Sequence, residues 1–176
     1  METAIKAGTL MTGMFPDRDS AERAYKAIQL RGYASDEIYL VMSEDVRNKH
    51  FASDGHTVNI GNKALEGTGT GSAIGITVGA IAAAIAAVGV SIVVPGLGLV
   101  IAGPLVAAAA GAGAGGVAGG LIGALIGAGI PQERAVIYEK GLQEGNIVVG
   151  VRPKSDADAE YIQNDWIKNN VIEIHH

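Results

Sequence analysis

The stretch "GAGAGGVAGGLIGALIGAG", residues 111–129, consists almost entirely of glycine, alanine and a few branched aliphatic residues. Its glycines recur at every fourth position, at Gly111, Gly115, Gly119, Gly123 and Gly127. Small residues at this spacing form a groove along one helix face, where a second backbone can approach closely. In water each glycine weakens an isolated helix by ~1 kcal/mol relative to alanine. We therefore expect a helix here only against close neighbours or in surroundings of low dielectric constant.

The uncharged sequence extends well beyond this stretch. Residues 67–132 contain no Asp, Glu, Lys, Arg or His, and a span of that length suits two membrane-crossing helices. We predict helices at about 70–94 and 104–129, each about 38 Å long at ~1.5 Å per residue. The predicted turn between them carries Pro95, Gly96, Gly98 and Pro104.

The first predicted helix carries a similar row of small residues. Gly71, Gly75 and Gly79 are followed in the same register by Ala83 and Ala87. The two rows therefore predict a helical hairpin whose glycine faces pack against neighbouring helices, and they are our candidate oligomerisation residues.

Two environments for this hairpin remain open. Lys63 and Arg134 flank the span, and basic residues at these positions would keep the rest of the chain on the cytoplasmic side of a membrane. Alanine and glycine favour insertion only weakly, however, and aromatic belts are absent at both ends. The alternative is a soluble homo-oligomer whose hairpins share one apolar core. A phosphate-binding loop at 67–75 is disfavoured because the Walker lysine is missing.

The charged flanks predict alternating strands and helices. In the first flank we expect a strand at 7–15, a helix at 17–33, a strand at 36–43 and a polar linker at 44–67. In the second we expect a helix at 131–145, a strand at 146–153, a helix at 155–170 and a strand at 171–174. Asp19 with Glu22 resembles a capping box, Gly32 and Gly145 fit helix C-caps, and Ser155 fits an N-cap.

This order, βαβ followed by αβαβ, predicts an α+β fold of the ferredoxin-like open-sandwich type, with helices on one face of a sheet. The apolar Gly/Ala-rich helical hairpin would be inserted between its halves. We expect residues 1–62 to form the first half and linker, residues 63–130 the hairpin, and residues 131–176 the second half.

Composition excludes several classes of function. The net charge of −5 and a pI near 5.3, with basic and acidic residues interspersed, disfavour nucleic-acid binding. The lack of cysteine excludes disulfides and thiolate chemistry and suits a reducing cytoplasm. His50, Asp54 and His56 lie in the polar linker, where a solvated loop explains them better than a metal site. We find no signal peptide and no catalytic motif, and we expect no enzyme activity, cofactor or metal.

Two segments of the flanks suggest a family. "GMFPDRDSAERAYKAIQLRGYASDEIYLVM" at 13–42 and "ERAVIYEKGLQEGNIVVGVRP" at 133–153 together resemble the bacterial general stress proteins, also called heat-induced stress protein YflT-like or low-temperature-induced proteins. The shared features are a D-x-x-x-A-x-x-A helix, the tyrosine of "IYEKGL" and the "GNIVVGV" strand. The resemblance implies a bacterial stress-response setting, with a glycine-rich central segment, and brings no catalytic residues.

Together these observations predict a non-enzymatic, stress-associated protein that assembles with copies of itself through a glycine-zipper hairpin, in or against a membrane. It would lie on the cytoplasmic side of the inner membrane, with lipid as a partner. One alternative is a soluble homo-oligomeric particle or filament in the cytoplasm. Another is a small-ligand regulatory module that uses a face of the sheet as its binding site.

Overall fold

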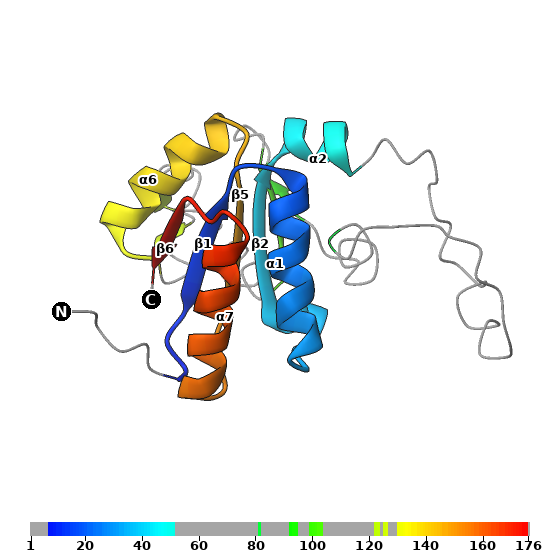
Figure 1. Ribbon diagram of the computed structural model, residues 1–176. Coiled ribbons are helices and arrows are strands. Elements are labelled where there is room, and N and C mark those ends of the chain that lie inside the picture. The colour runs from blue at the N-terminus through cyan, green and yellow to red at the C-terminus, as the bar shows by residue number, and fades with distance from the viewer. Residues whose placement is uncertain are drawn as a thin grey trace, which may run out of the picture.

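The computed structural model describes residues 7–51, 81, 92–94, 99–103, 122–123, 125–126 and 130–175. The described strands are β1 (Met11–Phe15), β2 (Ile38–Ser43), β3 (Ile92–Val94), β4 (Leu99–Ala102), β5 (Ile147–Val151) and β6 (Glu173–His175). The described helices are α1 (Arg18–Leu30), the 3-10 turn η1 (Ser35–Glu37), α2 (Glu44–His50), α6 (Gln132–Gln143) and α7 (Asp156–Lys168). Figure 1 shows their arrangement. The expected α+β class is confirmed.

The described strands form one antiparallel sheet in the order β3-β4-β2-β5-β1-β6. β5 lies between β1 and β2, so a strand from the second flank separates the two strands of the first. Val149 of β5 is opposite Gly13 on one side and Leu40 on the other. The two flanks therefore fold as one body.

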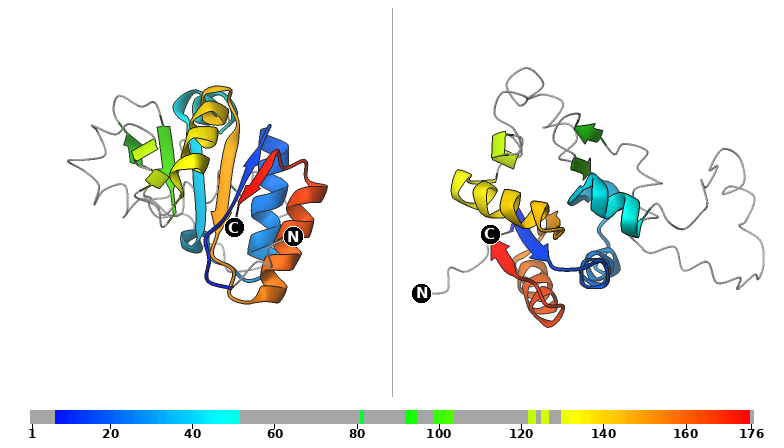
Figure 2. Two further views of the ribbon diagram at one scale, coloured as in Figure 1. Left: turned by 90° about the vertical axis from the view of Figure 1, so that its left-hand side faces the viewer. Right: turned by 90° about the horizontal axis from the view of Figure 1, so that it is seen from above.

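Helices cover both faces of this sheet. Figure 2 shows α1 and α7 on one face and α6 on the opposite face. The expectation of helices on one face only was wrong: α6 turns Ala135, Tyr138 and Leu142 towards the sheet, and all three are buried. A helix with three apolar side chains on one side must bury that side against another element, and α6 buries it against the second face of the sheet.

The first face is built around aromatic residues of α7, β1 and α1. The rings of Phe15 and Trp166 meet edge to face with their centroids 5.7 Å apart, and both side chains are fully buried. Gly13 leaves room for the indole, because a Cβ at this position would lie 2.7 Å from Trp166 Cε3. Tyr25 and Ile28 of α1 complete this part of the core.

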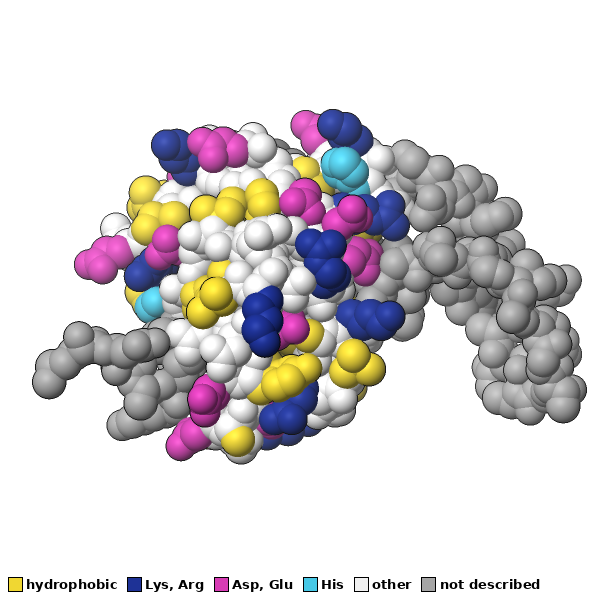
Figure 3. Space-filling view, in the orientation of Figure 1, with side chains coloured by type: hydrophobic (Ala, Val, Ile, Leu, Met, Phe, Trp, Pro, Cys, Tyr) yellow, Lys and Arg dark blue, Asp and Glu magenta, His cyan; other side chains and the backbone are white. Residues whose placement is uncertain are grey.

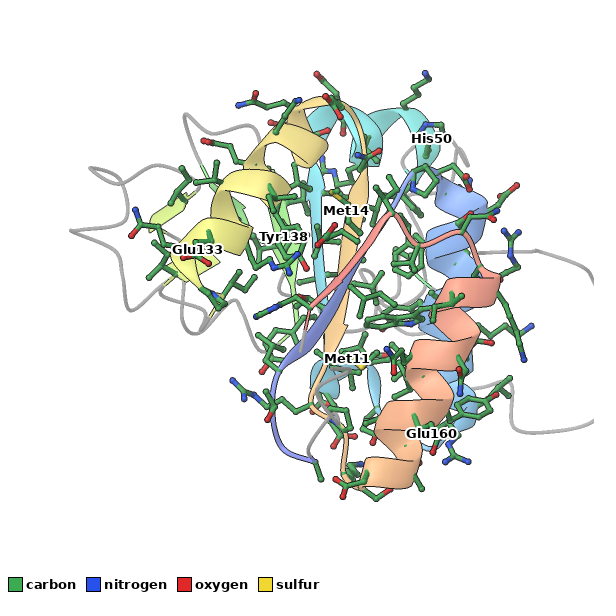
Figure 4. All side chains as sticks on the ribbon, turned by 60° about the vertical axis from the view of Figure 1, so that its left-hand side comes forward. Met11, Met14, His50, Glu133, Tyr138 and Glu160 are labelled. Atoms are coloured by element: carbon green, nitrogen blue, oxygen red, sulfur yellow. The ribbon has the colours of Figure 1, made fainter. Side chains whose placement is uncertain are left out.

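The second face carries a polar contact within its apolar packing. The hydroxyls of Thr12 and Tyr138 lie 2.7 Å apart and both residues are buried. Burial raises the pKa of Tyr138 above its ordinary value, so the hydroxyl stays protonated at neutral pH. Figure 4 shows Tyr138 extending from α6 towards the sheet, near Met14. Gly141 allows α6 to lie close to Met14 of β1, since a Cβ at position 141 would collide with the Met14 sulfur.

Local capping chemistry sets most helix boundaries. Ser155 accepts a hydrogen bond from the Asp158 N–H at 3.1 Å, which confirms it as the N-cap of α7. The α1 N-cap is Asp17, whose carboxylate accepts the Ser20 N–H at 2.8 Å, and not Asp19 as expected. Gly32 and Gly145 have φ of +88° and +92° after α1 and α6, as their predicted positions require.

Part of the predicted polar linker is helical. α2 occupies residues 44–50, and the Ser43 hydroxyl caps it by accepting the Val46 N–H at 3.2 Å. Two acidic residues in its first turn and basic residues in its last complement the helix dipole. Val46 is buried against the body, which explains why so short a helix forms.

The structure also bears on membrane insertion. Within the described part of the chain, no helix combines the length and the apolar character needed to cross a membrane.

The paired hydroxyls of Thr12 and Tyr138 yield a first prediction. Tyr138→Phe should lower the free energy of unfolding by about 1–3 kcal/mol, because it leaves the buried Thr12 hydroxyl without its side-chain partner. Thr12→Val combined with Tyr138→Phe should cost less than the sum of the two single changes. Urea unfolding of all four proteins measures this coupling, and strictly additive losses would contradict it.

Candidate functional site: the junction of the uncharged span with the sheet

The middle of the uncharged span forms a β-hairpin that belongs to the sheet. β3 and β4 are antiparallel, with Val94 opposite Leu99, and β4 in turn pairs with β2, with Ile101 opposite Val41. The predicted helix at 70–94 is therefore wrong at 92–94. The predicted turn at 95–104 is wrong at 99–102, where the chain is a strand.

The composition of this segment explains the difference. "SIVVPGLGLVIAG", residues 91–103, contains two short runs of largely β-branched residues around a Pro-Gly pair. Such residues lose side-chain freedom in a helix and pack well on a pleated surface. Short apolar runs bounded by Pro and Gly are typical of buried strands, and this was the signal that the sequence offered.

β4 contributes side chains to both cores. Leu99 and Ile101 belong to the core beneath α6, whereas Val100 and Ala102 belong to the core beneath α1 and α7. Each of these residues is at most 6% exposed. The alternation follows from the pleat of a strand, and it means that both faces of the body depend on residues of the uncharged span.

Gly103 ends this strand at a position that excludes other residues. Its φ of +85° lies in the left-handed region, and a Cβ would collide with the backbone carbonyl of Ile38. The chain therefore leaves β4 in direct contact with the start of β2. Only a residue without a side chain allows both conditions.

A second junction lies at Ile81, which is helical and fully buried in the core beneath α1 and α7. Its backbone N–H donates to Glu22 Oε2 of α1 at 3.0 Å. Arg18 Nε lies 4.0 Å from Glu22 Oε1, and the Arg18 guanidinium stacks over the ring of Phe51, 5.0 Å from its centroid. A carboxylate on the body thus binds the backbone of the uncharged span.

A third junction lies beneath α6. Leu125 and Ile130 are 1% and 2% exposed, and the Ile130 N–H donates to the Leu125 carbonyl at 3.0 Å. Ile122 packs against the same core. Gly123 is helical and half-buried, and it is the member of the predicted glycine rows that falls among the described residues.

The other predicted site residues lie outside the described residues. They are Gly71, Gly75 and Gly79 of the first row, Gly111, Gly115, Gly119 and Gly127 of the second, and Pro95, Gly96, Gly98 and Pro104 of the predicted turn. Sequence reasoning missed the residues that join the span to the body, namely Glu22, Ile81, β4 and Gly103. Glu22 was interpreted as part of a cap because nothing local marks its distant partner.

A charged cluster lies where α1, η1 and α7 meet. Arg31 pairs with Asp158 at 2.5 Å, and Tyr33 donates to the same carboxylate at 3.0 Å. Lys154 pairs with Glu37 at 2.8 Å. Burial alone would raise the pKa of Asp158, but the Tyr33 hydrogen bond and the Arg31 charge outweigh it and hold this pKa below its ordinary value. Its acids and bases are paired with one another. We call this cluster of Arg31, Tyr33, Glu37, Lys154 and Asp158 the clasp, because it holds neighbouring elements together.

The described part of the chain contains no group of three or more His, Cys, Asp or Glu side chains that could hold a metal ion. His50 ends α2, and its carbonyl accepts a hydrogen bond from Arg18. Asp54 and His56 lie outside the described residues.

Comparison with known proteins finds no match to a family model, to a curated protein or to a solved structure.

The Gly103 junction yields a second prediction. Gly103→Ala should destabilise the protein by clearly more than the ~1 kcal/mol expected for a left-handed alanine alone, because the paired strands β4 and β2 must separate to admit a methyl group. Gly32→Ala is the matched control, since Gly32 has φ +88° and no atom within 4 Å of an added Cβ. Thermal unfolding of both variants measures the difference. Equal losses would contradict a close approach at Gly103.

The clasp yields a third prediction. A carboxyl group whose pKa is lowered by folding contributes stability above its unfolded pKa, and that contribution disappears as the pH falls through the folded pKa. Asp158→Asn should therefore lower the urea midpoint at neutral pH, and the gap to the parent protein should close as the pH falls through the lowered pKa of Asp158. The exposed Glu160 of the same helix provides the control variant Glu160→Gln. A gap for Asp158→Asn that does not depend on pH would contradict the role of its charge.

Proposed function

We propose that this chain is a non-enzymatic protein of a bacterial stress-response setting that assembles with copies of itself through the glycine rows of its uncharged span. The observation that carries the proposal is the distribution of charge: all 31 charged Asp, Glu, Lys and Arg residues lie outside residues 67–132. A sequence this long and apolar is expected to associate with partners other than water, because large apolar surfaces drive association when they are exposed.

The junctions support the proposal by fixing the span to the body at several points. Ile81, β4 and Leu125 are buried in the two cores, so the segments between them begin and end on a folded surface. A tethered segment loses less conformational entropy on binding than a free one, which favours association through it.

A membrane was the first environment expected for the assembly, and lipid remains a proposed partner on the cytoplasmic side of an inner membrane. The hairpin in the sheet gives specific support to the alternative, a soluble assembly with a shared apolar core. β3 occupies the end of one predicted spanning helix, and 18 residues remain between Gly103 and Ile122. That number is at the lower limit for one helix that crosses a bilayer core of ~30 Å.

For the body, we propose a ferredoxin-like unit extended by the β3–β4 hairpin. The order β6-β1-β5-β2, with α1 and α7 packed together, supports this assignment. The resemblance to bacterial general stress proteins is consistent with such a unit, and the stress-response setting rests on that resemblance alone. A ligand site on a bare sheet face has less support, because α6 covers the face that such a unit would leave open.

The glycine rows give a fourth prediction. Gly119→Leu should convert the assembly to a smaller species, because the leucine side chain would hold two helices apart. Gly113→Leu is the matched control, since residue 113 would lie on the opposite side of a helix from the 111–127 row. Light scattering after size exclusion, in buffer and in detergent, measures the size of both variants. Identical sizes for Gly119→Leu and the parent protein would refute assembly through this row.

Flotation of the untagged protein on liposomes separates the two environments. A membrane assembly should float with lipid and resist carbonate extraction. A soluble assembly should stay in the lipid-free fraction at the same size.

A further inference from the structure

The outward face of α6 carries apolar residues that the body does not cover. Val136 and Ile137 are 49% and 41% exposed, whereas Ala135, Tyr138 and Leu142 on the inner side of the helix are buried. Figure 3 shows hydrophobic side chains over α6 with acidic and basic side chains beside them. Adjacent apolar residues at the centre of an exposed helix face favour a partner.

Charges of opposite sign frame this apolar pair. Glu133 lies one turn before it and Lys140 one turn after it, and both are exposed. Figure 4 shows Glu133 on the side of α6 away from Tyr138. The Lys140 side chain is 79% exposed, with Glu144 4.0 Å away, so its contact with Glu144 leaves it accessible to a second acid. Neighbouring Arg134 pairs instead with Glu173 of β6.

The spacing makes the face complementary to itself. Residues 133, 136, 137 and 140 follow the i, i+3, i+4, i+7 pattern of one helix stripe. The midpoint between 133 and 140 coincides with the midpoint between 136 and 137. A two-fold axis through that point, with the helices antiparallel, therefore places each Glu133 against the partner's Lys140 and each Val136 against the partner's Ile137.

We propose that α6 is a homodimer interface, in which this stripe pairs antiparallel with the same stripe of a second copy. The interface goes beyond the proposed assembly through the glycine rows, because it uses none of their residues. The two contacts are separate, and together they would link copies into larger assemblies.

The body holds this stripe in place before any partner arrives. Tyr138 is hydrogen-bonded to Thr12, Gly141 packs directly on Met14, and Arg134 is paired with Glu173. A helix fixed in this way loses little freedom on association. The stripe is nevertheless smaller than the ~800 Å² per partner of a standard interface, so we expect a weak dimer that depends on concentration.

Charge exchange tests the pairing in the Gly119→Leu background, which removes the contribution of the glycine row. Glu133→Lys and Lys140→Glu should each raise the dimer dissociation constant by about tenfold or more, because each places like charges together. The double variant should recover the parent value. A mixture of the two single variants should form a heterodimer in preference to either homodimer, as native mass spectrometry would show.

Two controls match the changes in net charge. Glu160→Lys and Lys168→Glu alter exposed residues of α7, and neither these variants nor their mixture should affect the dimer.

Val136→Ser with Ile137→Ser should abolish the dimer and leave the thermal unfolding temperature nearly unchanged, because both side chains are exposed. The proposal is overturned if the Gly119→Leu protein stays monomeric at millimolar concentration, or if the mixed charge variants show no preference for each other. Assembly through the glycine rows would stand or fall separately, on the comparison of Gly119→Leu with Gly113→Leu.

Discussion

The position of β5 between β1 and β2 is the constraint on which the rest of this structure depends. The first flank makes two strands that are not neighbours, and the second flank supplies the strand that fills the gap between them. Ile147, Val149 and Val151 of β5 enter one core and Val148 enters the other. The long uncharged span must therefore begin and end at the body, because the hydrogen bonds of the central strand cannot form otherwise.

Residues of the uncharged span form part of the sheet and of both cores. β4 extends the sheet beyond β2, Ile81 enters one core and Leu125 the other, and a carboxylate of α1 accepts a backbone N–H of the span. Each junction removes apolar surface from water, and each sets where a glycine-rich segment begins or ends. The proposed association through the glycine rows is thus tied to the fold through these junctions.

The polar contacts discussed above for the described residues hold elements of the fold together. The charged cluster around Asp158 pairs its own charges, and the buried hydroxyl of Tyr138 is held by Thr12. Both contacts fasten one element to another. The outward stripe of α6 differs, since its apolar centre is exposed and, as we propose, is covered by a second copy.

The sequence by itself determined most elements of the two flanks, but it assigned α2 to a polar linker. Alternating apolar residues, the Ser155 cap and glycines at positions 32 and 145 act within a few residues of each boundary, and local chemistry is readable without a fold. It also determined the uncharged span, which follows from composition alone. The proposed role of the glycine rows rests on that pattern.

Only the tertiary structure decided where the described residues of the span and those of α6 lie. The run around Pro95 could extend a helix or pair as a strand, and the choice fell to strands because β2 offered an open edge. Gly103 and Glu22 acquire their roles from Ile38 and Ile81, partners far away in the chain. Coverage of the second sheet face by α6 likewise depends on contacts between distant segments. Pairings of this kind depend on chain geometry, which no local pattern of residues specifies.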